Sequence, residues 1–169
     1  MNEYVYAEKW VELAQRERDP FDRFVYCYFA LNAIYNPFYE RNERQAIKSL
    51  YRETFNTHHD FKIRMKQIKL MPEFKYFIER RPIRNCRYNP QVNPNDRFDT
   101  SQEVRDLCDG SLFKSNVAML MIIYQIRCNL FHGNKRYDSE VNHEIMENAS
   151  KILLAYMHAF LENKVSAYN

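Results

Sequence analysis

Glycine is nearly absent from this chain of 169 residues, which contains only two. Strand-rich folds need glycine at tight turns, so its scarcity favours helices. The glycine-rich loops that hold phosphate in kinases, P-loop proteins and dinucleotide-binding folds are excluded for the same reason. Long apolar runs are also missing, since none approaches about 18 residues, and the first ten residues carry two glutamates. We therefore expect neither a transmembrane helix nor a signal peptide.

Paired cysteines are missing as well. The chain has four widely separated cysteines and no Cys-x-x-Cys motif: Cys27, Cys86, Cys108 and Cys128. A disulfide scaffold would be denser in cysteine, and a zinc site would show paired spacing. We therefore expect reduced thiols, two or three of them packed as small hydrophobic residues, in a cytoplasmic protein with no metal and no cofactor.

Apolar residues, by contrast, are plentiful: they make up 46% of the chain, and tyrosine and phenylalanine together number 25. Their spacing predicts helices over residues 3–18, 20–35, 41–55, about 61–68, 72–81, 101–107 and 115–132, and a last helix capped by Ser139. Asp19-Pro20 and Asn36-Pro37 mark the two ends of the second helix, whose inner face we expect to hold Phe24, Tyr28, Leu31 and Tyr35. The sequence thus predicts one all-α domain over residues 1–169 with a bundle core.

The helical pattern breaks between residues 81 and 99, where three prolines and four asparagines occur. We interpret this stretch as a long basic loop and expect it to be the most flexible part of the chain. Residues 61–98 carry a net charge of +7, whereas the rest of the chain carries −4. A basic segment on an acidic body suggests a polyanionic partner, with RNA the first candidate, and a merely solvated surface is an equally good alternative. The candidate contacts in this region are Arg80, Arg81, Arg84 and Arg87.

The most apolar predicted helix ends in a group of polar residues. Residues 117–126 are apolar almost all round, so we expect this helix to be enclosed by its own bundle or partly by a second subunit. Arg127 continues the stripe of Leu120 and Tyr124, where an unpaired charge is costly, so it needs a partner or a ligand. His132 lies about 140° further round the helix, yet at a helix end both side chains can reach one cleft. The favourable dipole of a helix C-terminus offers a purely structural alternative for both, and for Lys135.

A second polar residue, Asn32, lies in an apolar stretch of the second helix. A buried amide needs hydrogen-bond partners. Asn32 therefore either reaches the Arg127–His132 end or ties two helices together, and the tie is the interpretation we favour.

The Arg-x4-His spacing, followed by Gly133 at the end of an apolar helix, resembles the signature of the HEPN family. Residues 126–135, Ile-Arg-Cys-Asn-Leu-Phe-His-Gly-Asn-Lys, look much like the motif region of the Apea-like branch of that family. Residues 28–35, Tyr-Phe-Ala-Leu-Asn-Ala-Ile-Tyr, resemble an upstream helix of the same branch. The likeness covers two helices. It implies an up-and-down bundle of four core helices with short extra helices, of the kind found in toxin–antitoxin, defence or RNA-processing systems.

The resemblance also implies an activity. Active members are metal-independent endoribonucleases in which two subunits bring their Arg–His pairs together and the RNA 2′-hydroxyl attacks the adjacent phosphate. By this analogy His132 transfers protons and Arg127 holds the phosphate, while Asn129 orients either His132 or the phosphate. Active members commonly carry a polar residue directly after the arginine, where this chain has Cys128.

Three hypotheses follow. The first is a homodimeric HEPN ribonuclease that acts on RNA, with an antitoxin from a neighbouring gene as a further partner and no membrane association. The second is a catalytically silent module of the same fold that binds RNA or a nucleotide. The third is a structural protein in which Arg127 pairs with an internal acid such as Asp22 and faces no cleft.

Overall fold

The computed structural model describes residues 3–131 and 140–165, and within these ranges the chain forms eight α-helices and one turn of 3-10 helix. The elements are α1 (Glu3–Arg16), α2 (Pro20–Tyr35), η1 (Asn36–Phe38), α3 (Glu43–Thr57), α4 (His59–Lys69), α5 (Pro72–Glu79), α6 (Ser101–Asp109), α7 (Leu112–Phe131) and α8 (Glu140–Glu162). The described ranges contain no strand, although Arg84 and Asp99 form an isolated antiparallel bridge. The all-α class predicted from the sequence is confirmed.

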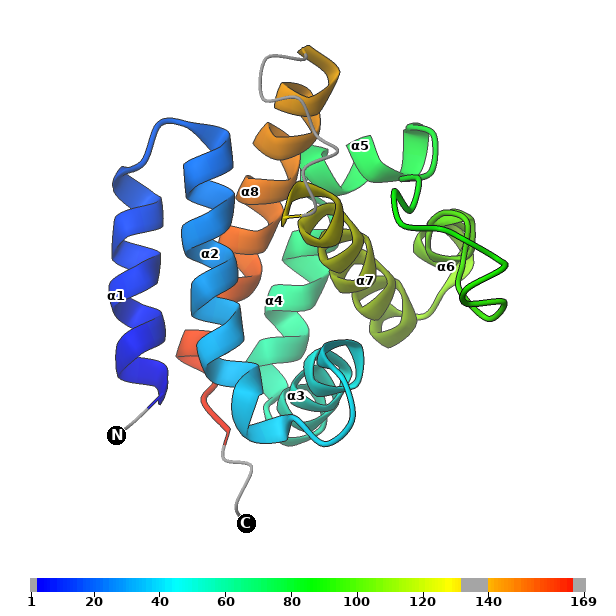
Figure 1. The fold of residues 1–169 in the computed structure, drawn as a ribbon. Helices are drawn as coiled ribbons and strands as arrows, with labels where there is room; N and C mark the ends of the chain where they lie inside the picture. The colour runs from blue at the N-terminus through cyan, green and yellow to red at the C-terminus, as the bar shows by residue number, and fades with distance from the viewer. Residues whose placement is uncertain (1–2, 132–139, 166–169) are drawn as a thin grey trace.

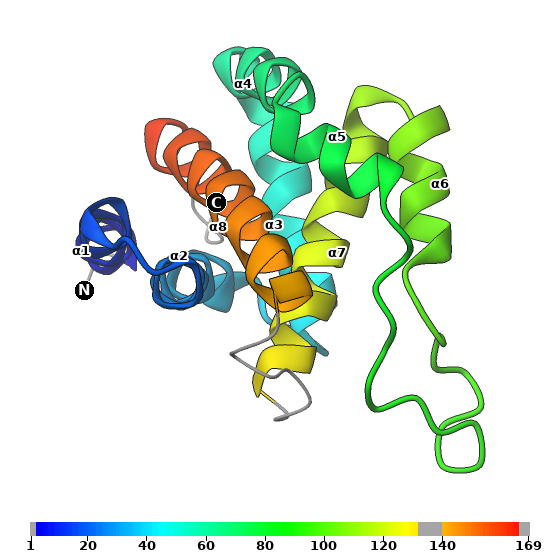
Figure 2. The same cartoon turned by 90° about the horizontal axis from the view of Figure 1, so that it is seen from above.

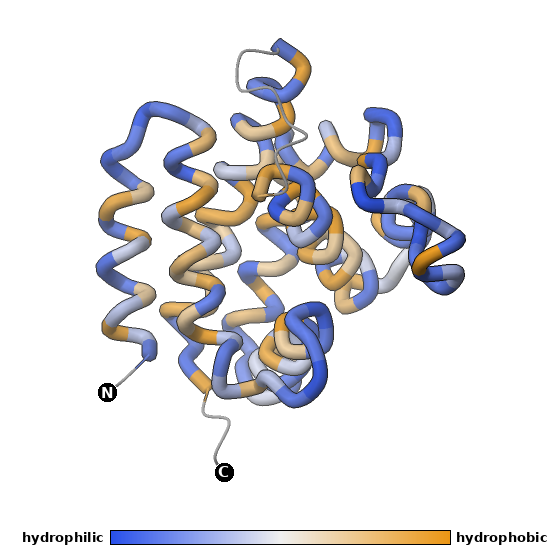
Figure 3. The backbone as a smooth tube through the Cα atoms, viewed as in Figure 1, coloured by the Kyte–Doolittle hydropathy of each residue, from blue (hydrophilic) through white to orange (hydrophobic). Residues whose placement is uncertain are grey.

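Helix α8 lies at the centre of the arrangement. It packs against α1 and α2 on one side and against α4, α5 and α7 on the other (Figures 1 and 2). The antiparallel pair α1 and α2 forms one edge of the molecule, and α6 packs on α7 at the opposite edge. Apolar and polar segments alternate along α1 and α2 (Figure 3), as amphipathic helices require.

The ends of α2 follow the local rules that predicted them. The side chain of Asp19 accepts hydrogen bonds from the backbone amides of Phe21 at 2.9 Å and Asp22 at 3.1 Å, and Pro20 occupies the first helical position. The helix ends at Tyr35, directly before Asn36-Pro37. The expected inner face of α2 is buried throughout, as predicted: Phe24, Tyr28, Leu31 and Tyr35.

The buried face of helix α1 is not the face that carries its large apolar residues. The residues that predicted the helix are Tyr6, Trp10 and Leu13, but Tyr6 and Leu13 are 41% and 46% exposed. The buried face consists of Tyr4, Ala7, Val11 and Ala14. Its two alanines allow the backbone of α1 to lie close to its neighbours, so an aromatic stripe remains on the surface.

Helix α7 is enclosed within its own chain, by α3, α4, α6 and α8. Every residue from Ala118 to Ile123 is buried. The buried polar residue Asn116 accepts a hydrogen bond of 2.6 Å from the hydroxyl of Tyr156 on α8. Of the two alternatives for this helix, the bundle itself thus accounts for its all-round apolar character, and a second subunit is not needed to cover it.

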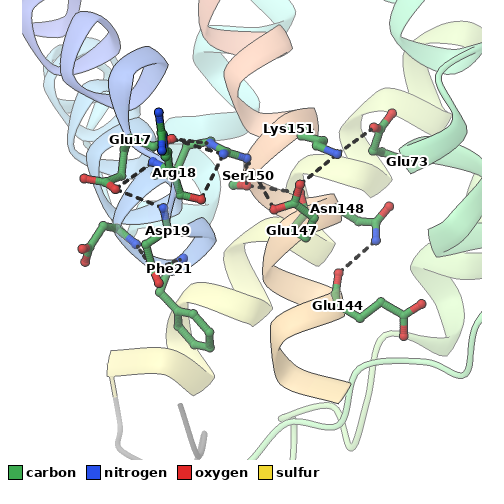
Figure 4. A network of polar contacts seen from close by, with 12 residues as sticks. Glu17, Arg18, Asp19, Phe21, Glu73, Glu144, Glu147, Asn148, Ser150 and Lys151 are labelled. Atoms are coloured by element: carbon green, nitrogen blue, oxygen red, sulfur yellow. Dashed lines mark hydrogen bonds and ion pairs between the residues drawn. The ribbon is translucent and has the colours of Figure 1, made fainter. Parts of the chain in front are cut away.

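A polar network fastens the connection between α1 and α2 to the middle of α8 (Figure 4). The guanidinium of Arg23 donates to the carbonyl of Glu17 at 3.1 and 3.2 Å and lies 3.5 Å from a carboxylate oxygen of Glu147. Glu147 also pairs with Lys151, one turn further along α8, at 2.8 Å. These contacts fix the relative position of α2 and α8, which carry much of the core.

Candidate functional site

Arg127 lies in the last turns of α7, and its partner is an acid that the sequence did not indicate. Its Nη1 atom is 3.3 Å from Oε2 of Glu43, the first residue of α3. The guanidinium also lies over the rings of Tyr28 and Phe131, at 5.4 and 5.1 Å from their centroids. Asp22, the acid considered from the sequence, is exposed in the first turn of α2. Arg127 is therefore paired with an internal acid, as the third hypothesis predicts, but that acid is Glu43 and not Asp22.

Glu43 is itself held by two tyrosines. Its Oε1 atom accepts hydrogen bonds from the hydroxyl groups of Tyr28 at 2.8 Å and Tyr35 at 2.5 Å. These tyrosines are seven residues apart on α2 and so lie on one face of the helix. Burial, together with the hydrogen bond to Glu43, raises the pKa of both hydroxyls, which therefore remain neutral donors. One carboxylate oxygen thus receives the tyrosines while the other faces Arg127.

The guanidinium of Arg127 keeps its charge in this setting. Burial opposes the charge, but Glu43 and the other neighbours outweigh it and raise the pKa of Arg127. The side chain is 28% exposed. Its Nε atom is buried and makes no hydrogen bond within the described residues. Arg127 is accordingly a fixed cation whose donors Glu43 engages only in part.

Asn129 was considered as a catalytic residue, but its hydrogen bonds join it to Gln125 and to the basic loop. It is buried, at 3% exposure, and its side-chain nitrogen donates to the backbone carbonyl of Arg84 at 2.7 Å. Its side-chain oxygen accepts from the backbone amide of Cys86 at 3.2 Å and from the side chain of Gln125 at 3.0 Å. Because its amide is engaged by the loop, we assign Asn129 a positioning role: it fastens the basic loop to α7.

The basic loop between α5 and α6 is also closed at its base. The backbone amide of Ile83 donates to the hydroxyl of Thr100 at 2.8 Å, and the amide of Thr100 donates back to the carbonyl of Ile83 at 3.0 Å. Two residues further into the loop on each side, the amide of Asn85 donates to the carbonyl of Phe98 at 2.8 Å. The loop extends beside α6 and α7 (Figure 2). Its composition predicted flexibility, and the structure adds the points at which it is fastened.

The arginines of this region divide between two sides of the loop. Arg80 and Arg84 line a cavity of about 350 Å³ that also contains Asn129. The Nε and Nη1 atoms of Arg80 are buried and make no hydrogen bond within the described residues. Arg87 lines a different cavity on the other side, and Arg81 is exposed. The four arginines predicted as RNA contacts thus do not form a single patch.

The cavity beside Arg87 has a volume of about 590 Å³ and brings together three parts of the chain. Arg44 comes from the start of α3, the side chains of Tyr124, Gln125 and Cys128 come from α7, and the loop supplies the remaining wall. Arg44 lies over the ring of Tyr124 at 5.6 Å. Cys128 directly follows Arg127 in the chain, but Arg127 itself does not line this cavity. Neither Arg44 nor the cavity could be predicted from the sequence, because the loop that closes the cavity has no repeating pattern.

The remaining predicted site residues lie apart from Arg127 or outside the described residues. Asn32 is exposed and lines a surface hollow with Trp10 and Phe29, on the α1 side of α2. The expectation that it is a buried amide tying helices together was wrong, because α2 is the edge of the bundle there. His132 and Lys135 both lie outside the described residues.

Fewer cysteines are buried than the sequence led us to expect. Cys27 is fully buried, Cys86 and Cys128 are half-buried, and Cys108 is exposed. The expectation of two or three packed thiols therefore reduces to one. Burial raises the pKa of Cys27 to about 12. In the described part of the chain, no three His, Cys, Asp or Glu side chains gather closely enough to hold a metal ion.

Comparison with models of known protein families, with curated proteins and with solved structures finds no match to this chain. Among the described helices, none combines the length and the apolar character needed to cross a membrane.

Proposed function

We propose that this chain is an RNA-binding protein of the HEPN type that cleaves RNA without a metal ion, with Arg127 and His132 as its catalytic pair. The observation that carries the proposal is the setting of Arg127: a charged, 28% exposed guanidinium held in one orientation near the end of α7. A planar fork of donors is suited to hold a phosphate and to stabilise the charge that develops on it. Glu43 orients that fork through one nitrogen.

The chemistry follows from these two side chains. The 2′-hydroxyl of one ribose attacks the neighbouring phosphorus, and the bond from phosphorus to the 5′ oxygen breaks. The products are a 2′,3′-cyclic phosphate and a 5′-hydroxyl end. His132, which directly follows the last described residue of α7, accepts the proton of the 2′-hydroxyl, and a proton is returned to the departing 5′ oxygen. An imidazole with an ordinary pKa near 6.5 serves both transfers near neutral pH.

The proposal includes partners. Arginines of the basic loop attract the RNA backbone, so binding weakens as the salt concentration rises. Two copies of the chain form the active unit, and an antitoxin from a neighbouring gene is a further partner of an enzyme of this kind. Because the middle of α7 is buried within its own chain, the dimer contact uses another surface. Phe131, which is 49% exposed beside Arg127 at the described end of α7, is available for a protein contact that brings two Arg127–His132 pairs together.

A second candidate function is a catalytically silent module that holds RNA or a nucleotide. Glu43 favours it, because this carboxylate offsets the charge that Arg127 offers to a phosphate. The presence of Cys128 after the arginine and the engagement of Asn129 by the loop favour it as well. In this case Arg127 contributes to binding while His132 is dispensable.

RNA cleavage in the presence of EDTA distinguishes the two functions. The wild type is compared with Arg127→Ala, with His132→Ala, and with Arg16→Ala as a matched control, since Arg16 is exposed on α1. The ribonuclease predicts cleavage by wild type and control, loss in both site variants, and products that end in a 2′,3′-cyclic phosphate. The silent module predicts no cleavage by the wild type, with RNA binding that weakens in Arg127→Ala and not in His132→Ala.

A further inference from the structure

The cavity between the start of α3, the C-terminal half of α7 and the basic loop carries an inference that rests on the proposed action on RNA. It encloses about 590 Å³, within the range of pockets that hold small organic ligands. All the residues that line it belong to the described part of the chain. Its walls are fastened in place, because Asn129 and Gln125 of α7 hold the loop. The cavity is thus formed before any ligand arrives.

The charges of the cavity favour an anion. Two arginines, Arg44 and Arg87, line it together with one carboxylate, Asp96. Both oxygens of Asp96 already accept hydrogen bonds, one from the side chain of Asn85 and one from the backbone amide of Arg97, each at 3.0 Å. Repulsion of an anion by this carboxylate is reduced accordingly.

The guanidinium of Arg44 is only partly satisfied by the protein. Its nearest carboxylate oxygen, Oε1 of Glu103, is 3.8 Å away and is shared with Arg97, which lies closer at 2.8 Å. The Nε atom of Arg44 is buried and makes no hydrogen bond within the described residues. The side chain as a whole is 38% exposed, so an anion that enters the cavity can pair with its guanidinium.

Two of the four amide side chains that line the cavity, those of Asn89 and Gln125, offer one donor and one acceptor. The oxygen of Asn89 accepts from the backbone amide of Gln91 at 3.0 Å, which leaves its nitrogen to donate. The nitrogen of Gln125 donates to Asn85 and Asn129, which leaves its oxygen to accept. A donor and an acceptor on the wall of one cavity are the groups that a nucleobase edge requires.

We propose that this cavity binds one nucleotide unit of RNA, with its phosphate on Arg44 and its base read by Asn89 and Gln125. Cys128 on the cavity wall adjoins Arg127 in the chain, so their Cα atoms are about 3.8 Å apart. A nucleotide held here brings the next phosphate of the strand toward Arg127. The cavity thereby selects the nucleotide beside the cleaved bond.

Fluorescence anisotropy with 2′-O-methyl oligonucleotides of the four bases tests this assignment, since a blocked 2′-hydroxyl prevents cleavage. Arg44→Gln is expected to weaken binding of all four about tenfold and to reduce the slope of log affinity against log salt by about 0.7. Arg41→Gln, an equal charge change at an exposed position outside the cavity, is the control and is expected to stay within about twofold. Circular dichroism verifies that both variants are folded.

A second variant tests the reading of the base. Asn89→Ser keeps a side-chain oxygen that can accept from the amide of Gln91 but removes the amide donor. It is expected to reduce the differences in affinity among the four oligonucleotides while leaving their mean unchanged. Competition by nucleoside 5′-monophosphates tells whether a free nucleotide occupies the cavity as well: displacement of RNA that depends on Arg44 shows that it does, and an absence of displacement assigns the cavity to the strand alone.

Equal affinities of Arg44→Gln and Arg41→Gln would overturn the assignment, whatever the cleavage assay shows. Conversely, a wild type that binds through Arg44 but cleaves no unmodified RNA would remove the ribonuclease proposal and leave the nucleotide site in place. The two proposals therefore fail separately.

Discussion

Replacing Asn129 by alanine separates the positioning role of this residue from a catalytic one. The substitution removes the acceptor of the Cys86 amide and the donor to the Arg84 carbonyl. Each buried backbone group that loses its partner costs about 1–3 kcal/mol. Water reaches these partly buried groups once the loop moves, so we expect a total loss of about 2–4 kcal/mol in the free energy of unfolding. This is a large fraction of the stability of an ordinary domain.

The loss is measured by urea unfolding followed by circular dichroism, and its location by limited digestion with trypsin. Because the loop carries Arg84, Arg87 and Arg97, release of the loop is expected to speed cleavage at these arginines more than elsewhere. The control is Asn56→Ala, which removes an exposed amide from α3 and is expected to change stability by less than about 0.5 kcal/mol. An Asn129→Ala protein as stable as the control, with no faster digestion of the loop, would refute the positioning role.

Three further predictions concern other groups. Glu43→Gln leaves the half-buried Arg127 without its counter-charge and is expected to lower the free energy of unfolding by about 1–3 kcal/mol, whereas an unchanged urea midpoint would mean that the pair contributes nothing. A hydrogen bond from Lys151, one turn away, lowers the pKa of Glu147 below its ordinary value near 4.5. Glu147 therefore stabilises the fold above that pH, and this contribution disappears as the pH falls through the lowered pKa. Glu147→Gln should accordingly flatten the loss of stability between about pH 5 and pH 3 in urea unfolding. Cys108 is expected to react with a thiol reagent at pH 8 within minutes while Cys27, whose pKa is raised to about 12, reacts only on unfolding, and equal labelling of both in the native protein would contradict the buried position of Cys27.

The helices of this protein are predictable from the sequence because local signals define them. Asp19-Pro20 begins α2 and Asn36-Pro37 ends it, through backbone restrictions that act within a few residues. The choice of buried face is less local. Both faces of α1 carry apolar residues, and the packing of Ala7 and Ala14 against neighbouring helices decides in favour of the smaller ones.

The candidate site shows the same division. The position of Arg127 on a packed stripe predicts that it needs a partner, and it has one. The identity of that partner depends on how α3 packs on α2 and α7, which no spacing within α7 reveals. A signal for Glu43 did exist, since Tyr28 and Tyr35 on a buried face both need an acceptor for their hydroxyl groups. For Asn129 no such signal exists, because its partners are backbone groups of an irregular loop.

The most direct test of the central claim uses a DNA oligonucleotide that contains a single ribonucleotide, incubated with the wild-type protein in EDTA. If the 2′-hydroxyl is the nucleophile and Arg127 and His132 form the site, the strand is cut at one position, immediately 3′ of the ribonucleotide, and the upstream product ends in a 2′,3′-cyclic phosphate. Arg127→Ala and His132→Ala abolish the cut. An uncut strand, alongside unmodified RNA that is also left intact, would contradict the claim, as would cleavage at positions that carry no 2′-hydroxyl.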